Sequence, residues 1–144
     1  MKLILFKKVK IIIINMIEVK GYEELNKILW ENKDKDILTM LYFGTSWCGP
    51  CQKLKEKIKE ERDEILKLFC LYIDCDLEEN EKIVEDWKIE SLPTQIFIHL
   101  EDKNVVKDER IEGFDWIKLI MTYNEISEKS TELIHNKIIE NQSD

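Results

Sequence analysis

Two cysteines separated by two residues, Cys48 and Cys51, are the side chains in this sequence best suited to chemistry. An apolar run precedes them and a helical pattern follows, so Cys48 is expected just before the N-terminus of a helix. There the helix dipole and unpaired backbone N–H groups favour a thiolate, the form of cysteine that attacks disulfides. Cys51 lies one helical turn further on. We predict that Cys48 is the nucleophile that forms a mixed disulfide and that Cys51 resolves it.

The residues around the two cysteines suit the same chemistry. Gly49 and Pro50 stand between them, and Trp47 precedes them. Proline is tolerated in the first turn of a helix, where its missing N–H costs little, and it stiffens the loop between the two thiols. We therefore expect these three residues to form the active-site loop.

Three other interpretations of the cysteine pair stay open. A zinc site needs a second pair of ligands, but Cys70 and Cys75 are expected along a strand and at its end, and neither histidine is placed to help. No metal site is therefore predicted. A purely structural disulfide would close a very small loop and stabilise the fold little. The pair could also be a redox-inactive remnant on an adaptor protein.

The hydrophobic pattern predicts alternating strands and helices around the cysteines. The apolar run at residues 37–43, stopped by Gly44, is typical of a strand buried on both faces. The other expected elements are a helix beginning near Gly21, a helix from Gln52 to about Leu68, a strand at Phe69–Ile73, a helix at Glu78–Trp87, a strand at Gln95–Leu100, a strand between Val105 and Ile111, and a helix at Phe114–Ile126 whose apolar pattern continues to Ile139.

This order of elements predicts an α/β fold. Strands separated by helices in the first half imply parallel pairing, and two successive strands in the second half imply an antiparallel hairpin. The expected architecture is a mixed central β-sheet with α-helices on both faces.

The length of 144 residues indicates one main domain, for which we expect residues 16–126. Residues 127–144 are expected to be a helical C-terminal tail that packs on the domain or binds a partner. Residues 1–15 form an N-terminal extension containing four lysines and no acidic residue. The lysines break its apolar stretch, so it is too short to span a membrane and is a poor signal peptide. It is expected to run into an edge strand, or to be a degenerate targeting segment. Whether Met1 or Met16 is the true start stays open.

The net charge and the number of cysteines exclude some classes of function. The formal net charge of -8 argues against nucleic-acid binding, because an acidic protein repels phosphate backbones. Four cysteines in 144 residues are too few for a disulfide scaffold. Cys70 lies within an apolar strand pattern and is expected to be an inert core thiol. Cys75 stands between Asp74 and Asp76, whose negative charges raise a thiol pKa and reduce its reactivity.

The segment Trp47-Cys48-Gly49-Pro50-Cys51 resembles the active-site pentapeptide of the thioredoxin family at every position. The family also has a downstream cis-proline, to which Leu92-Pro93-Thr94 is similar in sequence and spacing, and a groove glycine, to which Gly113 is similar. The resemblance covers about Met16 to Ile126. It implies a thioredoxin-like fold in which Leu92, Pro93 in the cis form, Thr94 and Gly113 bind a substrate strand.

The same resemblance implies a function. It indicates a protein-disulfide reductase that binds no cofactor, carries a redox-active disulfide between Cys48 and Cys51, and acts on disulfide-containing proteins. Regeneration by a thioredoxin reductase-like flavin enzyme using NADPH is implied as well. We expect a cytoplasmic monomer without nucleic-acid or membrane contact. The alternatives are a disulfide oxidase or isomerase in an organellar or secretory compartment, if residues 1–15 are a targeting segment, and a non-catalytic adaptor.

The sequence departs from the family pattern at two positions. Typical thioredoxins have a buried Asp six residues before the first cysteine, and this sequence has Tyr42 there. The partner Lys of the next strand is replaced by Tyr72. The family's Asp is thought to help deprotonate the resolving cysteine, and a tyrosine titrates near ~10, so it is a poorer base at neutral pH. We predict slower resolution by Cys51 than in a typical thioredoxin.

Overall fold

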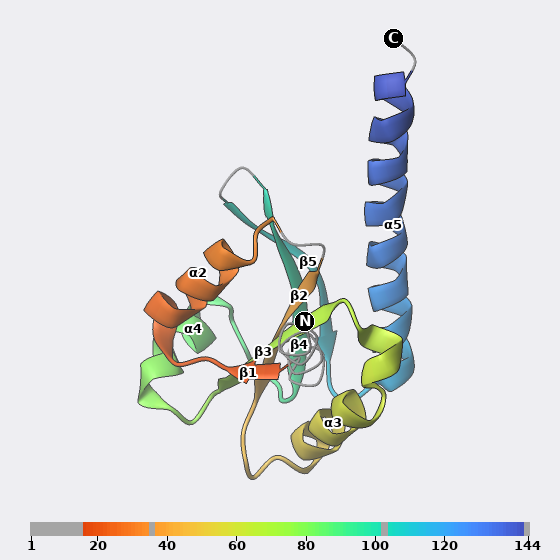
Figure 1. Cartoon of the computed structure of the whole chain (residues 1–144). Helices are drawn as coiled ribbons and strands as arrows, with labels where there is room; N and C mark the ends of the chain where they lie inside the picture. The colour runs from red at the N-terminus through yellow and green to blue at the C-terminus, as the bar shows by residue number, and fades with distance from the viewer. Residues whose placement is uncertain (1–15, 35–36, 102–103, 143–144) are drawn as a thin grey trace, which may run out of the picture.

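The computed structural model describes residues 16–34, 37–101 and 104–142. Its elements along the chain are β1 (Met16–Glu18), α2 (Gly21–Glu31), β2 (Leu38–Gly44), α3 (Gly49–Glu60), the 3-10 turn η1 (Arg62–Ile65), β3 (Leu68–Asp74), the 3-10 turn η2 (Glu78–Asn80), α4 (Glu81–Asp86), β4 (Thr94–Glu101), β5 (Asn104–Glu112) and α5 (Trp116–Gln142). Figure 1 shows one sheet with helices on both of its sides.

The sheet has five strands in the order β1-β3-β2-β4-β5. β3 pairs in parallel with β1 and β2, whereas β4 pairs antiparallel with β2 and β5. The predicted mixed α/β sheet, with parallel strands first and an antiparallel hairpin second, is confirmed. β1 is an edge strand, as expected for the end of the N-terminal segment. The rest of that segment, residues 1–15, lies outside the described residues.

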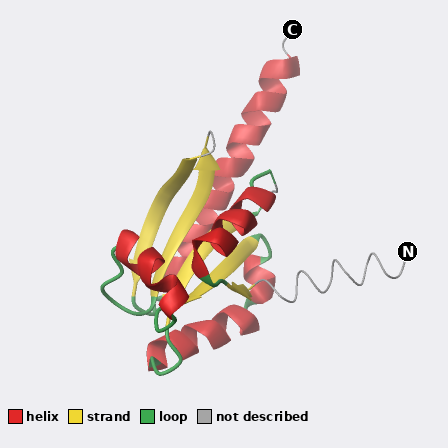
Figure 2. Cartoon of the chain, turned by 90° about the vertical axis from the view of Figure 1, so that its left-hand side faces the viewer, coloured by secondary structure: helices red, strands yellow, loops and turns green. Residues whose placement is uncertain are grey.

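Alternate residues of the strands point into two separate cores. Met40, Tyr42, Cys70 and Phe97 face a core completed by α3 and α5. Their neighbours along the strands, such as Leu41 and Phe43, face a core completed by α2 and α4. Both β2 faces are therefore covered, which explains why its sequence is a continuous apolar run rather than an alternating one. Figure 2 shows the sheet between these helical layers.

The helix predicted from Gln52 to Leu68 is wrong at both ends. α3 begins at Gly49, because Cys48 has extended backbone angles and Pro50 suits the first turn. It ends at Glu60, where Glu61 leaves helical geometry and the 3-10 turn η1 follows. Residues 59–64 are all charged, but the buried Ile65 follows the buried Ile58 by seven residues, which is two helical turns, so the spacing of apolar residues does not reveal the break.

The helix predicted at Glu78–Trp87 begins as the 3-10 turn η2 and becomes α-helical at Glu81. The closing helix extends beyond the domain, since α5 runs unbroken from Trp116 to Gln142. Figures 1 and 2 show its C-terminal half standing clear of the sheet. Ile138 and Ile139 are each 49% exposed, so packing of the tail on the domain does not bury them. Within the described segments, no helix is both long and apolar enough to cross a membrane.

Candidate active site

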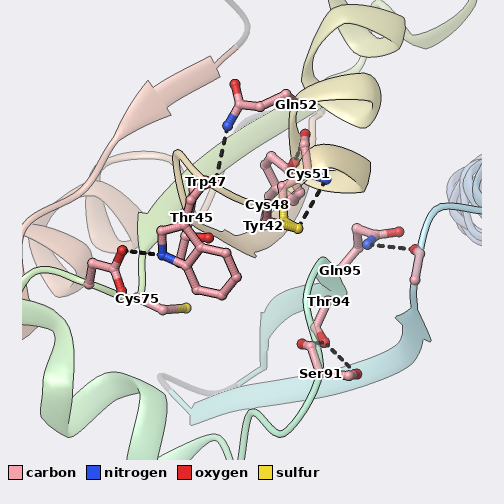
Figure 3. The surroundings of a disulfide bond; sticks show 12 residues. Tyr42, Thr45, Trp47, Cys48, Cys51, Gln52, Cys75, Ser91, Thr94 and Gln95 are labelled. Atoms are coloured by element: carbon pink, nitrogen blue, oxygen red, sulfur yellow. Dashed lines mark hydrogen bonds between the residues drawn. A yellow bond between two sulfur atoms is a disulfide. The ribbon is translucent and has the colours of Figure 1, made fainter.

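The cysteine loop connects the C-terminal end of β2 to the N-terminus of α3. Cys48 is the N-cap residue of α3, and its Sγ accepts a hydrogen bond from the Cys51 backbone N–H at 3.3 Å. Cys51, Leu54 and Ile58 are fully buried and recur at helical spacing on the inner face of α3. This apolar face anchors the helix, so the Cys51 side chain must point inward beneath the loop, as Figure 3 shows.

Cys48 and Cys51 are joined as a disulfide, with their Cα atoms 5.2 Å apart. Cys48 is 7% exposed and Cys51 is 0% exposed. The outer sulfur can therefore be reached by a partner, whereas the inner one can react only with Cys48. This asymmetry fits the predicted roles of nucleophile and resolving thiol, which stay predictions.

The loop exposes its other residues. Trp47 is 71% exposed, and its Nε1–H donates to Oδ2 of Asp76 at 2.6 Å. Gly49 and Pro50 are exposed too. The indole is thus held over the loop that follows β3, next to Cys75 (Figure 3).

The peptide bond between Leu92 and Pro93 is cis, as the sequence predicted. Thr94 pairs with Phe43 at the end of β2, so the sheet carries the proline loop to the cysteine loop. The Thr94 hydroxyl donates to the Ser91 carbonyl at 2.7 Å. The Gly113 N–H donates to the Pro93 carbonyl at 2.8 Å. The structure therefore brings together the four residues assigned to the substrate groove, although their role in binding stays a prediction.

Tyr42 and Tyr72 lie side by side beneath the disulfide, with ring centroids 5.2 Å apart. The Tyr42 hydroxyl donates a hydrogen bond to the Cys51 carbonyl. Burial, followed by the nearby Cys70 and Tyr72, raises the pKa of Tyr42 far above its ordinary value. Tyr42 is therefore a neutral donor at physiological pH and not a base. The Lys55 ammonium lies 4.1 Å from the Tyr72 ring centroid and places a positive charge on its face.

The two other cysteines are free thiols. Burial raises the pKa of Cys70 to about 12, so it is the inert core thiol that the sequence predicted. The pKa of Cys75 is raised to about 11, first by burial and then by Asp74 and Asp76. The sequence predicted this direction from the two charges alone, whereas desolvation is the larger cause.

A family model described as thioredoxin matches residues 16–121. The chain belongs to the thioredoxin family. Thioredoxin H2-1 of Oryza sativa subsp. japonica is 28% identical over 104 residues, which cover 72% of this chain and 71% of that protein. Peptide-N(4)-(N-acetyl-beta-glucosaminyl)asparagine amidase of Caenorhabditis elegans is 33% identical over 81 residues, 56% of this chain but only 13% of that protein.

Solved structures show the same fold. Trichomonas vaginalis thioredoxin superposes with a TM-score of 0.68 at 19% identity, covering 78% of this chain and 97% of that one. The germline-specific thioredoxin Deadhead of Drosophila melanogaster gives a TM-score of 0.61 at 30% identity, covering 76% and 98%. Together with the cysteine pair at disulfide distance, thioredoxin-family membership supports thiol–disulfide oxidoreductase chemistry. Among the described residues, no group of three or more His, Cys, Asp or Glu side chains is arranged to hold a metal ion.

Sequence reasoning missed two residues of this thioredoxin-family site. A Cβ added to Gly44 would lie 3.3 Å from Sγ of Cys51 and 3.2 Å from Cε2 of Tyr72, so glycine allows their close packing. Gln95 is 0% exposed beside the groove, and its Nε2–H donates to the Gly113 carbonyl at 3.2 Å. In the sequence, Gln95 is a single polar residue at the start of an apolar strand. Such a residue is ordinarily interpreted as marking the end of the strand rather than a buried position.

Proposed function

We propose that this thioredoxin-family chain is a dithiol reductant of protein disulfides. The observation that carries the proposal is the disulfide at the N-terminus of α3, with Cys48 outermost and Cys51 fully buried. A helix N-terminus stabilises negative charge through its dipole and unpaired N–H groups, so it favours the thiolate of Cys48 in the reduced protein. The Cys51 N–H is already directed at that sulfur.

In the proposed reaction, the Cys48 thiolate attacks one sulfur of a substrate disulfide. The substrate S–S bond breaks, one substrate thiolate leaves, and a mixed disulfide forms between Cys48 and the other substrate sulfur. The Cys51 thiol then loses its proton and attacks Cys48 Sγ, which releases the second substrate thiolate. Two electrons pass from the protein to the substrate, and the Cys48–Cys51 disulfide remains.

The cis-proline loop and Gly113 support a protein substrate rather than a small one. Main-chain groups of Leu92, in the loop just before Pro93, would pair with an extended segment of the partner, as in recognition of a peptide by strand addition. The α-carbon of Gly113 faces open space, because a Cβ built there would meet no heavy atom within 4 Å. The backbone of a substrate could therefore approach closely at this point.

Regeneration of the dithiol needs an electron donor, for which we propose a thioredoxin reductase-like flavin enzyme that uses NADPH. A protein of the same fold, thioredoxin f2, has been solved in a complex with ferredoxin:thioredoxin reductase. A reducing compartment such as the cytoplasm suits this cycle, because the pair must be reduced before each turnover.

The test is reduction of insulin disulfides by the purified protein with dithiothreitol as the electron donor, comparing the wild type with Cys48→Ser. We expect turnover that depends on Cys48. Activity of the wild type no higher than that of dithiothreitol alone would contradict the proposal. Capture of partners by Cys51→Ser, which leaves the mixed disulfide unresolved, would then decide whether the chain is a carrier with narrow specificity.

A further inference from the structure

Gln95 is a fully buried glutamine in the middle of the sheet face that α3 and α5 cover. It lies between Tyr42 of β2 and Ile111 of β5 in register, and all three side chains are 0% exposed. Its neighbour on the same face of β4, Phe97, belongs to the apolar core. An amide in such a place loses its hydration and must be compensated by hydrogen bonds.

The amide of Gln95 has one hydrogen bond to the groove. Its Nε2–H donates to the Gly113 carbonyl at 3.2 Å (Figure 3). The Gly113 N–H in turn donates to the Pro93 carbonyl at 2.8 Å. Both peptide groups that flank Gly113 are therefore held, one by the cis-proline loop and one by Gln95. Gly113 needs this support because its φ of +88° lies in the left-handed region, where glycine has no steric preference to keep it in place.

The oxygen of the amide is not paired. Oε1 of Gln95 is buried and has no hydrogen-bond partner among the described residues. A leucine would fill a similar volume with no polar atom to satisfy, so stability alone does not favour glutamine here. Residues that break a packing rule in this way are typical of functional sites.

We propose that Gln95 is a positioning residue of the substrate groove: its amide fixes the Gly113 carbonyl and so holds the open face of the Gly113 α-carbon, beside Pro93, where it receives the backbone of a protein substrate. This inference rests on the proposed reduction of protein disulfides. Gln95 acts through Gly113, and it takes neither a proton nor an electron in the reaction.

The experiment compares Gln95→Leu with the wild type in three measurements. We expect the KM for insulin to rise about threefold to tenfold, the range that corresponds to losing one hydrogen bond, with kcat changed by less than about twofold. The rate of reaction with dithiobis(nitrobenzoic acid), a small disulfide that does not need the groove, should stay within about twofold of wild type. The melting temperature should stay the same or rise, because a buried amide has been removed.

A second variant keeps the shape of the side chain. In Gln95→Glu, only the protonated carboxyl can donate to the Gly113 carbonyl, and burial favours that neutral form. The ratio of the variant KM to the wild-type KM should therefore fall toward one as the pH is lowered. Thr122→Val is the matched control, since it also removes one buried side-chain hydrogen bond, from the Thr122 hydroxyl to the Lys118 carbonyl, but this bond lies within α5 and does not involve Gly113.

The outcomes separate this inference from the proposed function. A wild type that does not reduce insulin overturns both. A wild type that reduces insulin, with Gln95→Leu at the wild-type KM and a pH-independent ratio for Gln95→Glu, overturns the positioning role alone. The same holds if Gln95→Leu and Thr122→Val raise the KM and lower the melting temperature together, since that pattern reports a general loss of structure.

Discussion

At the scale of single residues, the unusual feature of the site is the side chain that contacts the resolving cysteine, Cys51, from the sheet. Tyr42 takes the place of a buried acid, and its hydroxyl donates to the Cys51 carbonyl. Burial raises its pKa far above the physiological range, so it cannot accept the Cys51 proton. The reduced protein therefore has to lose that proton to another acceptor, and resolution of mixed disulfides should be slow.

We expect Tyr42→Asp to shorten the lifetime of a mixed disulfide with a model peptide, because a buried carboxylate can take the Cys51 proton. Acid quenching followed by mass spectrometry measures this lifetime. Loss of the buried ring should also lower the free energy of unfolding by about 3–5 kcal/mol, so the assay needs a temperature at which the variant is folded.

Tyr42→Phe is the control for this prediction. It removes the hydroxyl but adds no base, so it should destabilise the protein by about 1 kcal/mol without speeding resolution. A lifetime that is equal in the wild type and Tyr42→Asp would contradict a role for residue 42 in proton transfer.

At the scale of elements, the junction between β2 and α3 sets how closely the helix approaches the sheet. Two glycines stand at this junction in different surroundings. Gly44, at the end of β2, has the Cys51 sulfur and the Tyr72 ring against its α-carbon, whereas Gly49, at the start of α3, has open space around it. The same substitution at the two positions therefore separates packing from backbone effects.

We expect Gly44→Ala to lower the free energy of unfolding by about 1–3 kcal/mol, because the new methyl group overpacks the contact with Cys51. Gly49→Ala should be neutral or stabilising by up to about 1 kcal/mol, since alanine favours the helix and meets no neighbour. Urea denaturation with the disulfide intact measures both. Equal effects of the two substitutions would show that the close approach at Gly44 carries no energetic weight.

The two halves of α5 differ in how they contribute to the core. Tyr123 belongs to the core, and its hydroxyl accepts a hydrogen bond from the Lys67 N–H at 3.1 Å. Ile138 and Ile139, in contrast, are half exposed. The stability of the domain should therefore depend on the first half of the helix.

Removing residues 136–144 should lower the free energy of unfolding by less than about 1 kcal/mol, because Ile138 and Ile139, the large apolar side chains described in this segment, are half exposed and contribute little. Ending the chain at Ile120 instead removes Tyr123 and should leave the domain unfolded. Thermal denaturation of the two truncated proteins distinguishes these outcomes. A large loss on removing only residues 136–144 would mean that this segment packs on the domain after all.

At the scale of the whole molecule, the sheet face under α3 and α5 holds several buried groups whose neutral forms the fold favours. Burial raises the pKa of Cys70 from 9.0 to about 12 and that of Tyr72 from 10.0 to about 12. The folded protein thus keeps these protons to higher pH than the unfolded chain does. Their contribution to stability is full below pH 9 and is lost as the pH rises toward 12.

We expect the free energy of unfolding to fall steadily as the pH rises above 9, and Cys70→Val to show a shallower decline because one of these protons is gone. Urea denaturation at a series of alkaline pH values measures the slope. Parallel slopes for the wild type and Cys70→Val would contradict the assignment of a raised pKa to Cys70.

The sequence by itself was enough to predict the α/β fold class and the strands of the sheet, because β2 and β3 have long apolar runs that no exposed segment could carry. The spacing of the two cysteines predicted the cysteine loop, and the resemblance to the thioredoxin family implied the cis-proline. The sequence predicted the ends of the helices less well. The break after Glu60 lies within six charged residues, and Ile65 still follows Ile58 at the seven-residue spacing of a helix, so the apolar residues on either side do not mark it.

Only the tertiary structure decided which polar and small residues serve the site. Gln95 and Gly44 come from different strands, and their partners Gly113 and Cys51 are distant or on another element, so no local pattern marks them. The consequence of Tyr42 was also undecided, because its hydroxyl could have turned toward the cysteine sulfur or toward the backbone. A hydrogen bond is a short-range, directional contact, and its partner is fixed only when the sheet and α3 are packed together.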